Sequence, residues 1–202
     1  MRTVIIDYGM GNLRSVERAL AACGAHAEIS ADPEAVRGAE RLILPGVGAF
    51  GDAMENLRKA GLDGAILEAA GVGTPLLGLC LGLQLLFTQS EEFGRNEGLN
   101  LIPGSVRKLR VPKLHVPHVG WNQLEGIRPD PLMTRIPEGA YFYFVHSYYV
   151  EPACDPDILC WTEYGCRFCS VARRGNVWGA QFHPEKSQAA GRQLLRNFLS
   201  MG

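Results

Sequence analysis

A cysteine stands between two glycines in an apolar stretch, a spacing typical of a nucleophile. Residues 75–87 read PLLGLCLGLQLLF, with Cys80 between Gly78 and Gly82. The same pattern with serine marks a sharp strand-to-helix turn in hydrolases, where only small neighbours fit. A helix that begins after Cys80 would favour the thiolate and would offer the N–H of Leu81 to a developing oxyanion. The alternative is a buried core cysteine where a helix packs closely.

A cysteine nucleophile needs a general base, and His183 has suitable surroundings. It lies in GAQFHPEKS, after an expected strand, with Glu185 two residues later. A carboxylate beside an imidazole fixes its tautomer and stabilises the imidazolium. Cys80, His183 and Glu185 therefore form a candidate triad, although a strand-end histidine and a surface glutamate would explain each of the last two alone. His115 and His118 lie in a Pro-rich loop, where we expect a surface or interface position.

The elements that must position these residues alternate between strand and helix in the first half of the chain. The expected strands are 3–7, 25–30, 41–45 and 75–79. The expected helices are 13–23, one that opens at Asp32-Pro33, 52–60, 62–70 and one that begins at Leu81 and continues through LGLQLLF. This alternation predicts a parallel sheet that is covered on both faces.

The second half of the chain is richer in strands. The segment YFYFVHSYYV (141–150) is aromatic and β-branched, and short strands are expected at 158–164, 166–173 and 177–182. A closing helix follows Ser187, which is the expected N-cap. The predicted fold is therefore α/β, with an open, mostly parallel central sheet flanked by helices and an added antiparallel region in the C-terminal half. We expect a single domain over residues 1–202.

Composition limits the possible partners. Twenty basic and 21 acidic residues leave a net charge of −1, which gives no reason to expect nucleic acid or a membrane. The N-terminus reads as a strand rather than a signal peptide, so a cytoplasmic location is expected. Six cysteines without an export signal favour free thiols. Cys154, Cys160, Cys166 and Cys169 lack the paired spacing of a zinc site, so no metal ion is expected. Their role is open.

Three motifs resemble those of the class I (triad) glutamine amidotransferases. PLLGLCLGLQ resembles the nucleophile motif, HPE the second motif, and the segment PGVG (45–48) the glycine-rich oxyanion strand. Within this class the chain is most similar to the amidotransferase subunits of imidazole glycerol phosphate synthases. The stretches DYGMGNLRSV, PGVGAF, PHVGWN and HPEKS carry this closer resemblance.

The resemblance implies that glutamine is hydrolysed through a cysteinyl thioester. Cys80 would attack the side-chain amide, and His183, oriented by Glu185, would protonate the leaving ammonia and then activate water. The backbone N–H groups of Leu81, Val47 and Gly48 would hold the oxyanion. The implied glutamine contacts are Gly46, Gly48, Gln84, His146, Ser147 and Tyr148.

The resemblance also implies a partner. Ammonia would pass to a synthase (cyclase) subunit with a (β/α)8 barrel, in a heterodimer that serves histidine biosynthesis by forming imidazole glycerol phosphate and AICAR. The expected partner-facing residues are Asn12, Trp121, Tyr143 and Lys186, although a core tyrosine and a solvated lysine would explain the last two. No cofactor is expected, because the loop around Gly9 lacks the third glycine of a dinucleotide fingerprint.

Three other readings stay open at this point. The chain could serve another synthase, such as one that makes anthranilate or aminodeoxychorismate. It could be a non-catalytic regulatory subunit, which an intact triad argues against. It could also be a stand-alone cysteine hydrolase, which would be fully active without a partner.

Overall fold

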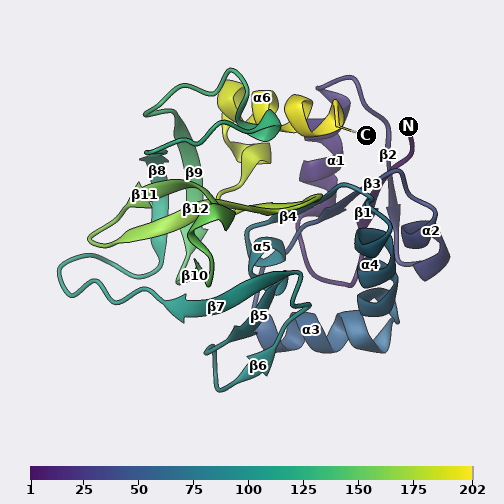
Figure 1. Cartoon of the computed structure of the whole chain (residues 1–202), viewed down its shortest axis with the longest axis horizontal. Coiled ribbons are helices and arrows are strands. Elements are labelled where there is room, and N and C mark those ends of the chain that lie inside the picture. Colours follow the sequence, from purple (N-terminus) through teal and green to yellow (C-terminus); the bar gives the residue numbers. More distant parts are fainter. Residues whose placement is uncertain (202) are drawn as a thin grey trace.

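Short aliphatic runs form the centre of a parallel sheet, as their pattern predicts. The computed structural model describes residues 1–201 (Figure 1). Five neighbouring strands of the sheet are all parallel. In sheet order they are β2 (Ala27–Ser30), β1 (Thr3–Ile6), β3 (Arg41–Leu44), β4 (Leu76–Leu79) and β13 (Val177–Ala180). The last four of these are buried along their whole length, which explains why they read as continuous apolar runs.

The sheet continues beyond β13 through mostly antiparallel strands. Gly175, with φ of 59°, lies in the turn of the hairpin between β12 and β13. The further strands of this sheet are β12 (Arg167–Arg174), β10 (Tyr148–Pro152), β7 (Ile102–Lys108), β5 (Phe87–Ser90), β6 (Asn96–Glu97) and β11 (Ile158–Glu163), which pairs with β12. A separate antiparallel pair is formed by β8 (His118–Gln123) and β9 (Tyr141–His146). The predicted α/β class with an added antiparallel region is confirmed.

Helices cover both faces of the sheet (Figure 1). On one face lie α1 (Leu13–Ala21) and α6 (Gln188–Leu199), which contact each other. On the other face lie α2 (Pro33–Arg37), α3 (Phe50–Lys59) and α4 (Leu62–Gly71). The short helix α5 (Leu81–Leu85) directly follows β4. Three 3₁₀ turns complete the chain: η1 (Pro131–Met133), η2 (Asp155–Asp157) and η3 (Pro184–Lys186).

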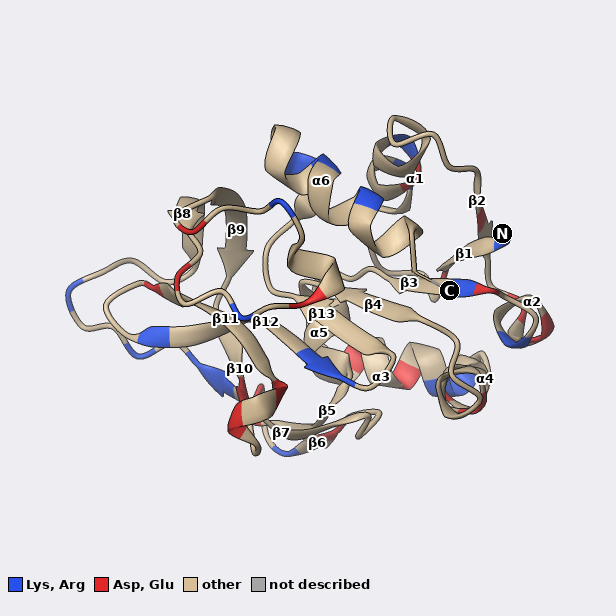
Figure 2. Cartoon of the chain, turned by 45° about the horizontal axis from the view of Figure 1, so that its top comes forward, with Lys and Arg blue, Asp and Glu red and all other residues tan. Residues whose placement is uncertain are grey.

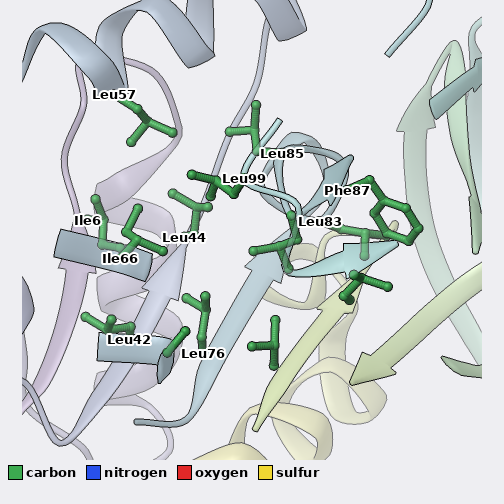
Figure 3. Packing of buried hydrophobic residues seen from close by; sticks show 14 of the residues in the cluster. Ile6, Leu42, Leu44, Leu57, Ile66, Leu76, Leu83, Leu85, Phe87 and Leu99 are labelled. Atoms are coloured by element: carbon green, nitrogen blue, oxygen red, sulfur yellow. The ribbon is translucent and has the colours of Figure 1, made fainter. Parts of the chain in front are cut away.

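Branched aliphatic side chains fill the space between the sheet and the α3–α4 layer (Figure 3). Fully burying one such side chain stabilises the fold by about 1.5–3 kcal/mol. The labelled members of this cluster are Ile6, Leu42, Leu44, Leu57, Ile66, Leu76, Leu83, Leu85, Phe87 and Leu99. Because β4 and α5 both contribute to it, the core packing fixes the turn between them.

Three expectations about individual elements need correction. The helix that begins at Leu81 ends at Leu85, because Phe87 already pairs in β5. The aromatic segment 141–150 is interrupted at Ser147, so its halves belong to two different sheets. Ser187 precedes α6, but its hydroxyl donates to the carbonyl of His183 and accepts from the N–H of Tyr143 instead of capping the helix.

Basic and acidic residues are interspersed along the ribbon of residues 1–201, with no region made up of one sign alone (Figure 2). On α2, for example, Arg37 pairs with Glu34 of the same helix and with Glu68 of α4. Exposed pairs of this kind contribute roughly 0–1 kcal/mol each. Within residues 1–201, none of the helices has the length and apolar character that a membrane crossing requires.

Candidate active site

Cys80 lies on a strained turn between β4 and α5. Its backbone has φ of 54° and ψ of −110°, outside the regions that L-residues normally adopt. A β-carbon on Gly82 would lie 1.8 Å from the carbonyl oxygen of Leu44, and one on Gly78 would lie 2.6 Å from the carbonyl oxygen of Gly82. The two glycines therefore let the turn pack against β3 and against itself, as the spacing predicted.

The next parallel strand brings His183 to the same edge of the sheet. Its Nδ1 lies 2.8 Å from a carboxylate oxygen of Glu185, and their side chains are 4% and 2% exposed. Because the carboxylate accepts, Nδ1 carries a proton and donates it to Glu185, which leaves Nε2 as the nitrogen available for chemistry. Within residues 1–201, Nε2 has no hydrogen-bond partner, although Cys80 is close enough to affect the imidazole.

Electrostatics around His183 favour the imidazolium. Burial alone disfavours the charged form, but the neighbouring Cys80 and the hydrogen bond to Glu185 outweigh it and raise the pKa of His183 to about 10. At neutral pH the ring therefore carries a proton that it can deliver to a leaving group. This is the behaviour required of a general acid beside a thiolate.

A cavity of about 230 Å³ opens in front of Cys80. Roughly 300–1,000 Å³ is typical of sites for drug-sized ligands, so this one suits a smaller substrate. Its lining residues are Val47, Gly48, Cys80, Leu81, Gln84, Glu92, Val145, Ser147 and Tyr148. The predicted oxyanion residues, and three of the side chains predicted to contact glutamine (Gln84, Ser147 and Tyr148), thus lie around one space.

Two residues predicted to contact glutamine, Gly46 and His146, do not line this cavity. Gly46 is packed tightly between Tyr8 and Leu81. A β-carbon at this position would lie only 2.4 Å from the Tyr8 hydroxyl oxygen. His146 points to the other side of β9, where it lies 3.1 Å from His118 and packs on Phe168. The alternation of side chains along a strand explains this, since Val145 and Ser147 face the cavity instead.

The expectation of a surface or interface position for His118 is wrong, because the side chain is buried within the chain. His118 is 2% exposed and stacks on Tyr164 at a centroid distance of 3.9 Å. Burial lowers the pKa of His118 to about 4 and that of His146 to about 3, so both rings are neutral at pH 7. The Pro-rich sequence around His118 concealed the strand β8, which buries this side chain.

The sequence did not identify Glu92 as a cavity residue. Its carboxylate lines the cavity and also accepts, at 2.7 Å, from the N–H of Phe50 at the start of α3. Phe50 lies two residues after Gly48, so its hydrogen bond to Glu92 holds the end of the glycine-rich segment in place. No local sequence pattern marks an acidic residue in the turn after β5 as functional, because only the tertiary fold brings it close to Cys80.

Three of the four predicted partner-facing residues form one cluster beside the site. Trp121 packs edge-on against Tyr143 at a centroid distance of 6.0 Å, and the Lys186 ammonium lies 5.7 Å from the same tyrosine ring. Trp121 is 46% exposed. The carbonyl of Tyr143 accepts from the N–H of His183, which connects this cluster to the triad. Asn12 is exposed at the start of α1.

The six cysteines are free thiols. Cys160 and Cys169 are buried on the paired strands β11 and β12, whereas Cys154 and Cys166 are half-buried. Within residues 1–201, no three His, Cys, Asp or Glu side chains are grouped closely enough to hold a metal ion.

Comparison with known proteins relates this arrangement of a cysteine, a buried His–Glu pair and a glycine-rich segment to a family. Residues 4–201 match the family model described as glutamine amidotransferase class-I. The chain belongs to this family. A solved structure entitled "Crystal structure of glutamine amidotransferase" is similar with a TM-score of 0.76 at 20% identity, and the similarity covers 97% of this chain and 96% of that one. At this identity it shows the shared class I fold.

Much closer relatives come from curated bacterial proteins. The imidazole glycerol phosphate synthase subunit HisH of Moorella thermoacetica is 53% identical over 96% of this chain and 92% of its own length. The subunit of the same name from Syntrophotalea carbinolica is 49% identical over 98% and 99%. The chain therefore spans nearly the whole length of these relatives. The resemblance predicted from the motifs is confirmed.

Proposed function

We propose that this chain is the glutamine-hydrolysing subunit of an imidazole glycerol phosphate synthase. The observation that carries the proposal is the strained Cys80 turn beside the buried His183–Glu185 pair, in a chain 53% identical to a HisH subunit. The reaction produces glutamate and ammonia, and a synthase partner uses the ammonia. The free cysteines fit a reducing compartment, so we also propose a cytoplasmic location.

The triad divides the chemistry among three residues. The Cys80 thiolate attacks the side-chain amide carbon of glutamine and forms a tetrahedral intermediate. His183 donates its proton to the leaving nitrogen, so that ammonia departs and a glutamyl thioester remains. The neutral imidazole then takes a proton from water, which attacks the thioester and releases glutamate. Glu185 holds the ring through Nδ1 in both steps.

The oxyanion is assigned to backbone donors on two sides of the nucleophile. Leu81 is the first residue of α5, where helix geometry leaves N–H groups without an intrahelical partner. Val47 and Gly48, from the segment after β3, line the same cavity. Gly48 has φ of 115°, a conformation that favours glycine. A glycine here lets the segment turn its N–H groups without a β-carbon penalty.

Glutamine recognition falls to acceptors that line the cavity. Both N–H groups of the Gln84 amide are used within the protein, by the carbonyl of Tyr148 at 3.0 Å and by Gln181 Oε1 at 3.2 Å. Its oxygen is therefore the atom left for a substrate donor. With the Glu92 carboxylate it forms a suitable site for the α-ammonium group of glutamine.

The partner is proposed to dock on the cluster of Trp121, Tyr143 and Lys186 and to contact Asn12, which is exposed at the start of α1. Tryptophan and tyrosine are enriched at protein interfaces, and Trp121 is exposed. The carbonyl of Tyr143 accepts from the N–H of His183, so docking there would place the partner beside the triad. We propose a (β/α)8-barrel synthase subunit as the partner, in a heterodimer.

The test is the rate of glutamate release by the wild type and by Cys80→Ala. Each is measured alone, and again with the barrel synthase and its nucleotide ligand. We expect low activity alone, a rise by orders of magnitude with the liganded partner, and no activity in the variant. High activity alone would indicate a free-standing hydrolase. Activity that this partner never stimulates would assign the chain to a different synthase.

A further inference from the structure

A buried glutamine beside the nucleophile has no role in the mechanism above. Gln181 lies between the end of β13 and His183, and it is 0% exposed. Its side-chain amide contacts two residues of the site. One amide atom faces Gln84 at 3.2 Å, and the other lies 3.9 Å from the Cys80 sulfur.

The orientation of this amide follows from its neighbours. The carbonyl oxygen of Tyr148 can only accept, and it lies 3.0 Å from the Gln84 amide, which must therefore present its nitrogen there. The same nitrogen faces Gln181, so the Gln181 atom on that side must be its oxygen. The Gln181 NH₂ group is left facing Cys80. The orientation is thus derived from a backbone carbonyl.

A second donor holds the carbonyl at the start of this chain of hydrogen bonds. His146 Nδ1 lies 2.8 Å from the Tyr148 oxygen. Because that oxygen only accepts, His146 donates from Nδ1 and accepts at Nε2 from His118, 3.1 Å away. Both lone pairs of the carbonyl are then used. The buried histidine pair, which does not line the cavity, thereby holds the carbonyl that sets the direction of the Gln84 and Gln181 amides.

An N–H group aimed at sulfur stabilises a thiolate more than a thiol, because hydrogen bonds to charged acceptors are the stronger ones. The titratable groups around Cys80 are His183 with Glu185 behind it, Tyr8, Glu92 across the cavity and, beyond His183, His146. Gln181 differs from all of them because it does not titrate. Its own charge is therefore the same at every pH, and only the ionisation of the sulfur changes the strength of the contact.

We propose that Gln181 is a positioning residue that stabilises the Cys80 thiolate by donating an N–H, with its amide held in the required direction by Gln84. The proposal rests on the proposed function insofar as this thiolate is the nucleophile for glutamine. It assigns to Gln181 a contribution additional to the electrostatic effect between His183 and Cys80. Removing the amide therefore shifts ionisation of the thiol even though His183 and Glu185 are intact.

The experiment measures alkylation of Cys80 by iodoacetamide as a function of pH, with the Cys80 peptide quantified by mass spectrometry to separate it from the other five cysteines. The variants are Gln181→Met, which has similar length and no donor, and Gln181→Asn, whose shorter amide does not reach the sulfur. Ser170→Ala is the matched control. Its hydroxyl is buried and hydrogen-bonded to Thr162, and its carbonyl accepts from the Gln181 N–H, but it does not contact Cys80.

We expect the midpoint of the Cys80 profile to rise by about one pH unit in both Gln181 variants and to stay unchanged in Ser170→Ala. Wild-type midpoints in the folded Gln181 variants would overturn the proposal, as would an equal shift in Ser170→Ala. If Gln181→Met does not fold, Gln181→Asn alone decides. Alkylation requires no glutamine, so an absence of glutaminase activity would refute the proposed function and leave this test intact.

Discussion

Replacing Gly82 with alanine tests whether the nucleophile depends on the tightness of its turn. A β-carbon at this position would lie 1.8 Å from the carbonyl oxygen and 2.8 Å from the carbonyl carbon of Leu44. Both atoms belong to the backbone of the central strand β3, which is fully buried. They cannot move aside as the end of a flexible side chain could, so α5 itself must move.

The size of this movement can be worked out from the contact. A non-bonded carbon and oxygen need a separation of roughly 3.3 Å, so α5 must shift away from β3 by about 1.5 Å. Displacing a reacting group by ~1 Å can cost about 100-fold in rate. Overpacking of a core costs about 1–3 kcal/mol, which lowers the melting temperature of a domain of this size by roughly 3–10 °C.

The assay is glutamate release in the presence of the liganded partner, together with thermal unfolding of the variant alone. Gly64→Ala is the matched control, because Gly64 lies inside the helix α4 and a β-carbon there meets nothing within 4 Å. We expect Gly64→Ala to keep full activity and to gain about 0.5–1 kcal/mol in stability. Gly82→Ala should lose at least about 100-fold in kcat.

Wild-type activity and melting temperature in Gly82→Ala would refute the steric argument. They would mean that the turn accommodates a β-carbon and that the glycine bracket has another cause. An equal loss in Gly64→Ala would show that any helical glycine is sensitive, and would remove the link between Gly82 and the nucleophile.

The remaining predictions concern the groups around the cavity. Glu92→Gln should raise the KM for glutamine about tenfold with little change in kcat, because it removes the charge that pairs with the ammonium group but keeps an acceptor for Phe50; an unchanged KM in initial-rate measurements would exclude that role. Because the pKa of His183 is raised to about 10 in the folded protein, its charged form stabilises the fold fully below pH 6.5, and this stabilisation is lost as the pH rises towards 10. The melting temperature of the wild type should therefore fall between pH 6.5 and about 10. In Glu185→Gln the melting temperature should fall less over this pH range. If melting temperature plotted against pH runs parallel in the wild type and the variant, the prediction is wrong. Tyr8→Phe removes a buried hydrogen bond of 2.8 Å to the carbonyl of Pro45 and should lower the melting temperature by roughly 2–4 °C, measured by thermal unfolding with the wild type as the reference.

Local sequence patterns were sufficient for most of the elements. The apolar runs 3–7, 41–45 and 75–79 are strands of the parallel core, because a strand buried on both faces reads as a continuous apolar run. The strand β8 was missed, since PHVGWN contains proline and glycine and half of its side chains are polar. The early end of α5 was missed because LLF continues the apolar pattern that a helix would also show.

Side-chain direction was harder to predict than secondary structure. His146 and Ser147 are neighbours in the chain, and only one of them faces the cavity, since alternate residues of a strand point to opposite sides. Glu92 and Gln181 reach the site through tertiary packing alone. The motifs identified the residues whose types are distinctive, and they could not identify a glutamate or a glutamine whose role depends on its neighbours.

Strand order explains how motifs far apart in the chain form one site. The neighbours of β4 in the sheet are β3 and β13, with Leu44 opposite Gly78 and Leu79 opposite Ala180. Because all three strands are parallel, their carboxyl ends lie at one edge, where ligands bind in open α/β sheets. The oxyanion segment follows β3, the nucleophile follows β4 and the base follows β13. The apolar pattern of each strand predicts that it is buried, but not which strands lie beside it. The proximity of Val47, Cys80 and His183 could therefore be recognised only from the three-dimensional structure. A shift of β13 by one residue against β4 would turn Gln181 away from Cys80, which makes the register of this one strand pair a requirement for the whole site.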